Sequence, residues 1–220
     1  MTGPRRPRAI LFDWDDTLVD NWESIHAAMN ATLAAMGKPP WTIEQTKFEA
    51  RRSLRNSFPE LFGDRWEEAR GVFYRHFAEN HLQFLKPHRG AEDAIHRLKK
   101  LGIYLAVISN KTGDYLRREA AHLGWGEHFG AIVGATDAPE DKPAPAPAIQ
   151  ALAKSGISPG PQVWLVGDGQ SDMECAHRAH CIAVLLRKMP PKPREFGNYP
   201  PVFHVRGFAE LEALVVDSEG

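Results

Sequence analysis

Short apolar runs alternate with amphipathic stretches along most of the chain. The apolar runs predict strands at 9–12, 103–108, 131–133, 163–166 and 182–186, with a weaker run at 202–205. Between most of these runs, apolar residues recur at helical spacing over 91–101, 114–123, 146–154 and 171–179. Strands that alternate with helices predict an α/β fold built on a doubly wound parallel sheet with right-handed crossovers.

One region interrupts this alternation. No convincing strand occurs over 21–86, and the pattern there predicts helices at 22–36, 43–58 and 64–84. The sequence therefore predicts a Rossmann-like core from residues 1–20 and 87–220, with residues 21–86 inserted as an all-helical cap domain. The insert is long enough for a small core of its own, which favours a mobile cap over a helical layer packed permanently on the sheet.

Composition excludes several classes of partner. The formal net charge of the 220 residues is −1, so no global field attracts nucleic acid or an anionic membrane. No apolar run approaches the roughly 18 residues of a membrane span. Cys175 and Cys181 form neither a disulfide framework nor a zinc motif, so we expect small core residues in a protein of the reducing cytoplasm.

Polar residues follow three of the predicted strands directly. The first strand ends at Asp13 and Asp15, which share one face of an extended chain, while Trp14 between them points to the other face and packs. The second strand ends at Ser109-Asn110-Lys111 and the fourth at Asp168 and Asp172. In a parallel sheet these groups meet at one edge, outside the carboxyl ends of the strands.

Four carboxylates in one crevice require positive charge. Two unit charges about 4 Å apart repel by about 4 kcal/mol at an effective dielectric near 20. Lys142 supplies one positive charge if its loop, which Pro143 keeps out of a helix, reaches the site. A hard divalent cation would supply the rest, and carboxylate oxygens without a His or Cys cluster favour Mg²⁺.

These groups together suit phosphoryl transfer. Asp13 can attack phosphorus as a nucleophile, and Asp15 can donate a proton to the leaving oxygen and later accept one from water. The Ser109 hydroxyl, Lys142 and free backbone N–H groups of the turn at 15–17 can hold the phosphoryl oxygens.

The sequence resembles the haloacid dehalogenase-like hydrolase superfamily, close to its phosphoglycolate-phosphatase-type members. Four motifs carry the resemblance, in the family's order: Phe12-Asp13-Trp14-Asp15-Asp16-Thr17-Leu18-Val19-Asp20, Val107-Ile108-Ser109-Asn110-Lys111, Lys142-Pro143-Ala144-Pro145 and Gly167-Asp168-Gly169-Gln170-Ser171-Asp172. The resemblance implies the sheet order 5-4-1-2-3 and a helical cap after the first strand.

The resemblance also implies roles for individual residues. It makes Asp13 the nucleophile and Asp15 the general acid and base. Mg²⁺ would be held by Asp13, the backbone carbonyl of Asp15 and Asp168, with Asp172 contacting it indirectly or through water. The residues that would bind phosphate or substrate are Asp16, Thr17, Ser109, Asn110 and Lys142.

Two positions depart from the family pattern. Asp16 stands where Gly is usual, and its side chain is expected to point away from phosphate; Gly169 stands where Thr or Ser is frequent. Asp15 argues against the dehalogenases, which lack the second carboxylate. Thr17 argues against the sugar-phosphate mutases, which usually carry Val or Ile there.

The predicted function is a Mg²⁺-dependent phosphatase for a small phosphorylated metabolite, phosphoglycolate-like or a sugar phosphate. Arg51, Arg52 and Arg55 of the cap would grip a substrate carboxylate or second phosphate, or alternatively form a solvated face. The alternatives are a receiver-like module that stores the phosphoryl group on Asp13 as a signal and, within the family, a mutase. The sequence leaves monomer and homodimer equally open.

Overall fold

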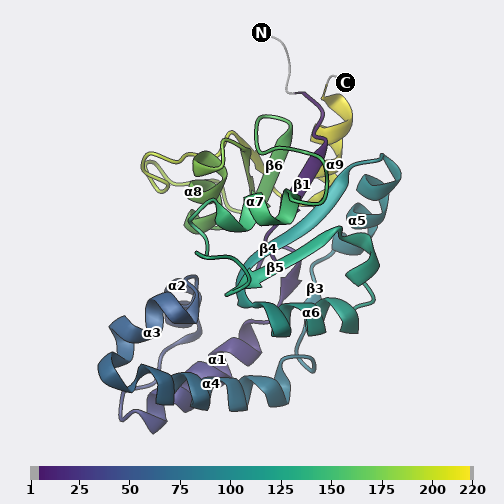
Figure 1. Cartoon of the computed structure of the whole chain (residues 1–220). Helices are drawn as coiled ribbons and strands as arrows, with labels where there is room; N and C mark the ends of the chain where they lie inside the picture. The colour runs from purple at the N-terminus through teal and green to yellow at the C-terminus, as the bar shows by residue number, and fades with distance from the viewer. Residues whose placement is uncertain (1–4, 219–220) are drawn as a thin grey trace.

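A six-stranded parallel sheet forms the centre of the molecule (Figure 1). The computed structural model describes residues 5–218. The strands of this sheet are β1 (Ala9–Phe12), β4 (Tyr104–Thr112), β5 (Ala131–Ala135), β6 (Val163–Gly167), β7 (Ile182–Leu186) and β8 (Phe203–Val205). Their order is β5-β4-β1-β6-β7-β8. The predicted order 5-4-1-2-3 is confirmed in β7-β6-β1-β4-β5, and the weak run at 202–205 adds β8 as a sixth strand at the edge.

Helices cover both faces of the sheet. One face packs against α5 (Ala91–Lys100), α6 (Gly113–His122) and α9 (Phe208–Asp217), and the other against α7 (Ala146–Leu152) and α8 (Gln170–Arg178). Alternate residues of β1 serve the two faces, so Ile10 and Phe12 join one hydrophobic cluster while Ala9 and Leu11 join the other. The predicted α/β doubly wound class is therefore confirmed.

The helical insert (residues 21–86) lies beyond the carboxyl end of β1, at the foot of the sheet in Figure 1. Its helices are α1 (Trp22–Ala35), α2 (Ile43–Glu49), α3 (Leu54–Phe62) and α4 (Trp66–Asn80). The insert begins and ends at a small antiparallel pair, β2 (Val19–Asp20) with β3 (Lys86–Pro87). It has a hydrophobic cluster of its own, in which rings of α3 and α4 pack edge to face against one another.

The predicted helix over 43–58 is wrong, because the chain divides it into α2 and α3. Residues 50–53 form a turn, and Ser53 adopts the extended conformation typical of the residue before a helix. Pro59 lies inside α3, although proline usually disrupts a helix interior, and the buried rings of Phe58 and Phe62 keep this helix packed. The turn at 50–53 is what turns Arg51 toward the sheet.

The order in which successive strands are added to the sheet reverses at β1. From β1 the sheet extends first through β4 and β5, and then on the other side of β1 through β6, β7 and β8. In open α/β sheets, ligands bind in the crevice outside the strand ends at such a reversal. Asp13 follows β1 and Asp168 follows β6, so two of the candidate carboxylates lie on the two sides of this crevice.

Candidate active site

The segment after β1 is a tight turn that separates its neighbours by face. The amide of Asp13 donates to the carbonyl of Val166 on β6 at 2.9 Å, which fixes the start of the turn. Trp14 is fully buried and packs edge to face on Trp125, as the alternation predicted. Asp16 has φ +62°, a left-handed conformation in which Asp is one of the better tolerated residues in place of Gly.

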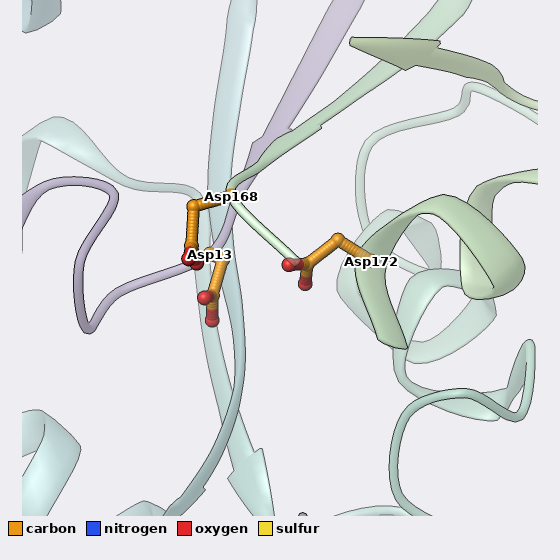
Figure 2. A group of neighbouring side chains, drawn as sticks. All are labelled: Asp13, Asp168 and Asp172. Atoms are coloured by element: carbon orange, nitrogen blue, oxygen red, sulfur yellow. The ribbon is translucent and has the colours of Figure 1, made fainter. Parts of the chain in front are cut away.

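Three buried carboxylates meet outside the strand ends (Figure 2). Asp13 and Asp168 lie side by side, and Asp172 points its carboxylate toward them from the first turn of α8. One oxygen from each lies within 4.8 Å of the others. Lys142 is 2% exposed and donates to Asp13 Oδ1 at 2.7 Å and to Asp172 Oδ1 at 2.6 Å. The Lys142 loop therefore reaches the site, as expected.

Burial and crowding shift the protonation of this cluster. Burial raises the pKa of Asp13 to about 8, with further raising by Asp172 and Asp168, although Lys142 opposes this. Burial also raises the pKa of Asp168 to about 6, against the opposing charge of Arg51. Burial lowers the pKa of Lys142, but Asp13 and Asp172 outweigh this and hold the pKa above its ordinary value. Three buried carboxylates thus face two cations, Lys142 and Arg51.

Asp15 has a lysine of its own. Lys111 Nζ donates to Asp15 Oδ1 at 2.7 Å and to Glu119 Oε2 at 2.6 Å. Burial raises the pKa of Asp15 to about 6, while Lys111 lowers it. The two aspartates of the first motif thus face different partners, Lys142 for Asp13 and Lys111 for Asp15, and this separation allows them different roles.

Glu119, which sequence reasoning missed, is the centre of a second polar network. It is fully buried on α6 and accepts hydrogen bonds from four side chains: Trp14 Nε1 at 2.7 Å, Asn21 Nδ2 at 2.9 Å, His81 Nδ1 at 3.0 Å and Lys111 Nζ at 2.6 Å. Burial raises its pKa, but Lys111 and the hydrogen bonds from His81, Lys111 and Trp14 hold the pKa below its usual range. The network joins the reactive turn to both ends of the helical insert.

A sequence signal for Glu119 exists but is weak. Glu119 lies on the same helix as the buried Leu116 and Ala120, and a charged residue is unusual on a helix face that packs into the core. Nothing in the sequence names its partners, since they come from four separate segments. Lys111 was visible in its motif, but its contact with Asp15 depends on how β4 ends. A register shift between Ile108 and Thr112 marks that end of the strand.

Arg51 of the insert reaches into the carboxylate cluster. Its Nη1 donates to Asp168 Oδ2 at 2.6 Å, and its Nη2 lies 4.0 Å from Asp16 Oδ2. A Cβ atom at Gly169 would lie 2.6 Å from the same Nη1. The glycine that departs from the family pattern therefore leaves the space that the Arg51 guanidinium occupies.

Ser109 and Asn110 lie in the last part of β4, at the same edge of the sheet. The Ser109 hydroxyl is buried and accepts from the Lys111 amide at 3.1 Å. The Asn110 amide group donates to the carbonyls of Arg51 and Lys142, each at 3.1 Å, so it holds the insert and the Lys142 loop together. Asn110 Oδ1 has no hydrogen-bond partner.

One cavity contains most of the candidate residues. It is lined from the sheet by Asp13, Asp15, Ser109, Asn110, Lys142, Asp168 and Asp172, and from the insert by Arg51 and Arg52 among others. Asp16, Thr17 and Arg55 are not among its lining residues. Asp16 instead lies near Arg51 and His88, and the fully buried Thr17 hydroxyl has no partner.

The backbone N–H groups of the turn at 15–17 were expected to be free to bind phosphate, and two of them are not. The Asp16 amide donates to Val19 O at 2.8 Å and the Thr17 amide to Trp14 O at 3.3 Å. These two N–H groups are used within the turn, so the expectation that they are free for phosphate is wrong. The remaining cap arginines are also paired: Arg52 with Glu60 and Arg55 with Asp141.

Comparison with known proteins identifies the family of this chain. Residues 10–186 match the model of the haloacid dehalogenase-like hydrolase family. The chain belongs to that family. It is 30% identical over 190 residues to a phosphoglycolate phosphatase of Pseudomonas syringae pathovar tomato, covering 82% of this chain and 69% of that protein. It is 31% identical over 173 residues to a phosphoglycolate phosphatase of Aquifex aeolicus, covering 78% and 81%.

A solved structure gives the same fold for a haloacid dehalogenase-like chain. The crystal structure of a predicted phosphoglycolate phosphatase from Haemophilus somnus superposes with a TM-score of 0.82 at 23% identity, covering 96% of this chain and 99% of that one. The predicted family membership is therefore confirmed, and the chain is a phosphatase, a phosphoric monoester hydrolase. Among its described helices, none is both long and apolar enough to cross a membrane.

Proposed function

We propose that this haloacid dehalogenase-like hydrolase is a Mg²⁺-dependent phosphatase that hydrolyses a small phosphorylated metabolite through a phosphorylated Asp13. The observation that carries the proposal is the separation of the two reactive carboxylates. Asp13 faces Lys142 among the clustered carboxylates, while Asp15 faces Lys111 outside that cluster. A nucleophile and an acid–base group need such separate surroundings.

The carboxylate cluster fits a divalent cation. Asp13, Asp168 and Asp172 offer oxygen ligands only, which suits Mg²⁺ rather than a softer metal. Burial raises the pKa values of Asp13 and Asp168, the neighbouring carboxylates raise them further, and a bound cation would oppose both effects. Mg²⁺ bound by Asp13, Asp168 and the Asp15 carbonyl, with Asp172 beside them, would ionise the nucleophile and neutralise charge on the phosphoryl oxygens.

In the first step, an Asp13 oxygen attacks phosphorus and the bond from phosphorus to the ester oxygen breaks. Asp15 gives its proton to the departing oxygen. A carboxyl group with a pKa of about 6 is partly protonated near neutral pH, which suits this role. Lys142 and the Ser109 hydroxyl hold oxygens of the phosphoryl group while it moves.

In the second step, Asp15 takes a proton from water and the water oxygen attacks phosphorus. The bond between phosphorus and Asp13 breaks, which releases inorganic phosphate, restores the Asp13 carboxylate and leaves Asp15 protonated for the next turnover. Lys111, held by Glu119, keeps Asp15 in place for both proton transfers. An acid–base group this close promotes turnover, which distinguishes the proposal from a receiver-like module that must keep its phosphoryl group.

The helical insert would act as the cap domain of this enzyme, with residues 21–86 moving on the core of 1–20 and 87–220. The contacts that cross between them include the ion pairs of Arg51 with Asp168 and Arg55 with Asp141, and the stacked rings of Tyr74 and Tyr115. Closure would exclude water during phosphoryl transfer, and reopening would release product. Two free buried cysteines fit a cytoplasmic enzyme.

The test is release of inorganic phosphate from p-nitrophenyl phosphate in the presence of Mg²⁺. We expect steady turnover by the wild type and a loss of more than about a thousandfold in Asp13→Asn, because the nucleophile is removed. Asp114→Asn, an exposed surface position, is the matched control and should keep full activity. A stable phospho-form without turnover would refute the phosphatase and favour the receiver.

A further inference from the structure

The cavity continues from the carboxylate cluster into the hydrophobic cluster of the insert. Six large apolar side chains of the insert line it, and we call them the insert wall: Trp22, Ile25, Met29, Leu54, Phe73 and Phe77. Five of them are less than one tenth exposed. The core adds Tyr115, whose ring stacks on Tyr74 of the insert with centroids 5.2 Å apart.

Positive charge in this cavity is already paired. Among the described residues that line it, Lys142 binds Asp13 and Asp172, and Lys111 binds Asp15 and Glu119. Arg51 binds Asp168, at the end where the phosphoryl group would sit. Arg52 makes two hydrogen bonds to the exposed carboxylate of Glu60.

A charged leaving group therefore has no partner against the insert wall. Moving a carboxylate from water into apolar surroundings costs several kcal/mol unless an opposite charge or donors meet it. On this side of the cavity the Tyr74 hydroxyl pairs with Thr112 and the Tyr115 hydroxyl donates to the Tyr74 carbonyl, whereas the buried Trp22 indole N–H has no hydrogen-bond partner. A single neutral donor does not balance a carboxylate, but it suits a neutral ring that carries an acceptor.

We propose that the natural substrate is the phosphate ester of an uncharged, largely apolar ring, with the ring packed against the insert wall. The inference rests on the proposed phosphatase function and names the substrate class of the same site. It predicts that phosphoglycolate, the substrate in the names of the related proteins, is a poor substrate for this chain. Arg51 acts at the phosphoryl end and not as a clamp for a substrate carboxylate.

The first experiment measures binding without turnover. Phenylphosphonate and phosphonoacetate share the phosphonate group. The first carries a neutral ring, and the second carries a carboxylate. In isothermal titration calorimetry of the wild-type enzyme with Mg²⁺, the Kd of phenylphosphonate should be at least about tenfold lower than that of phosphonoacetate, because the ring is buried. Equal affinity, or tighter binding of phosphonoacetate, overturns the inference.

The second experiment compares a wall residue with a matched neighbour. Phe73 lines the cavity. Phe58 packs edge to face on the Phe73 ring in the same hydrophobic cluster but does not line the cavity. Phe73→Leu should lower kcat/KM for phenyl phosphate at least about fivefold more than for methyl phosphate. Phe58→Leu should leave that ratio unchanged, even if it lowers Tm. A ratio that moves equally in both variants overturns the inference.

The two levels of the proposal fail in different ways. If phosphoglycolate has a higher kcat/KM than phenyl phosphate, the proposed phosphatase function stands and the proposed ring-bearing substrate class is wrong. If no phosphate ester is hydrolysed, the proposed function is wrong, and the phosphonate affinities still decide whether a ring site exists.

Discussion

The two halves of the cavity are both buried, yet they are built from opposite kinds of residue. The sheet half presents carboxylates and lysines that pair with one another, such as Lys142 with Asp13 and Lys111 with Asp15. The insert half presents rings and aliphatic side chains. Under the proposed function, the sheet half would carry the reaction and the insert half would select the leaving group, so changes in the two halves should affect different kinetic constants.

Removing the metal should have the largest effect, and only in the sheet half. EDTA should abolish phosphate release because Asp13 then stays largely protonated. The fold should survive, since a ligand at ten times its Kd stabilises a protein by only about 1.4 kcal/mol. Loss of phosphate release with unchanged far-UV circular dichroism would support this, and activity that persists in EDTA would contradict it.

The same metal-free protein should lose stability as the pH rises. Asp13 has a folded-state pKa of about 8, above its unfolded value of 3.8, so the folded state keeps a proton that the unfolded state releases. Stability should therefore fall from about pH 4 to pH 8, by about 1.4 kcal/mol per pH unit for one such proton. Urea unfolding at pH 5 and pH 8 measures this slope, and saturating Mg²⁺ should flatten it.

Glu119→Gln should have the next largest effect, again on kcat. The amide keeps the shape of the side chain but removes the charge that holds Lys111, so we expect kcat to fall about 10- to 100-fold with KM nearly unchanged. Loss of one partner of a buried ion pair should also lower the free energy of unfolding by about 3 kcal/mol. Glu212→Gln removes the carboxylate of a surface pair with Arg97 and is the matched control. A raised KM with normal kcat would contradict the role of Glu119.

Gly169→Ser should have the smallest effect, at the boundary between the halves. The new Cβ would take the space of Arg51 Nη1, so the contact with Asp168 should weaken and stability should fall by about 1 kcal/mol. Gly71→Ser, where a Cβ meets nothing within 4 Å, is the control. A double-mutant cycle with Arg51→Ala measures the coupling, and additive effects would show that Gly169 and Arg51 are independent.

Most of the sheet half could be predicted from local sequence patterns. Strand positions follow from short apolar runs, Asp13, Ser109 and Asp168 stand at or near strand ends where motifs place them, and Lys142 stands in the loop before α7. The insert was harder to predict, because the division between α2 and α3 depends on a turn at 50–53 that helical spacing conceals. The Glu119 network was not predictable, since its donors lie up to 105 residues away in the sequence.

Substrate choice and folding draw on the same side chains in the insert. Trp22, Ile25, Met29, Phe73 and Phe77 belong both to the cavity wall and to the hydrophobic cluster that holds the insert together. Evolution toward a new substrate at these positions would therefore alter how well the insert folds. The less buried Leu54 and Tyr74 lie at the margin of that cluster, and they offer protein engineers the positions where selectivity can change at the least cost to folding.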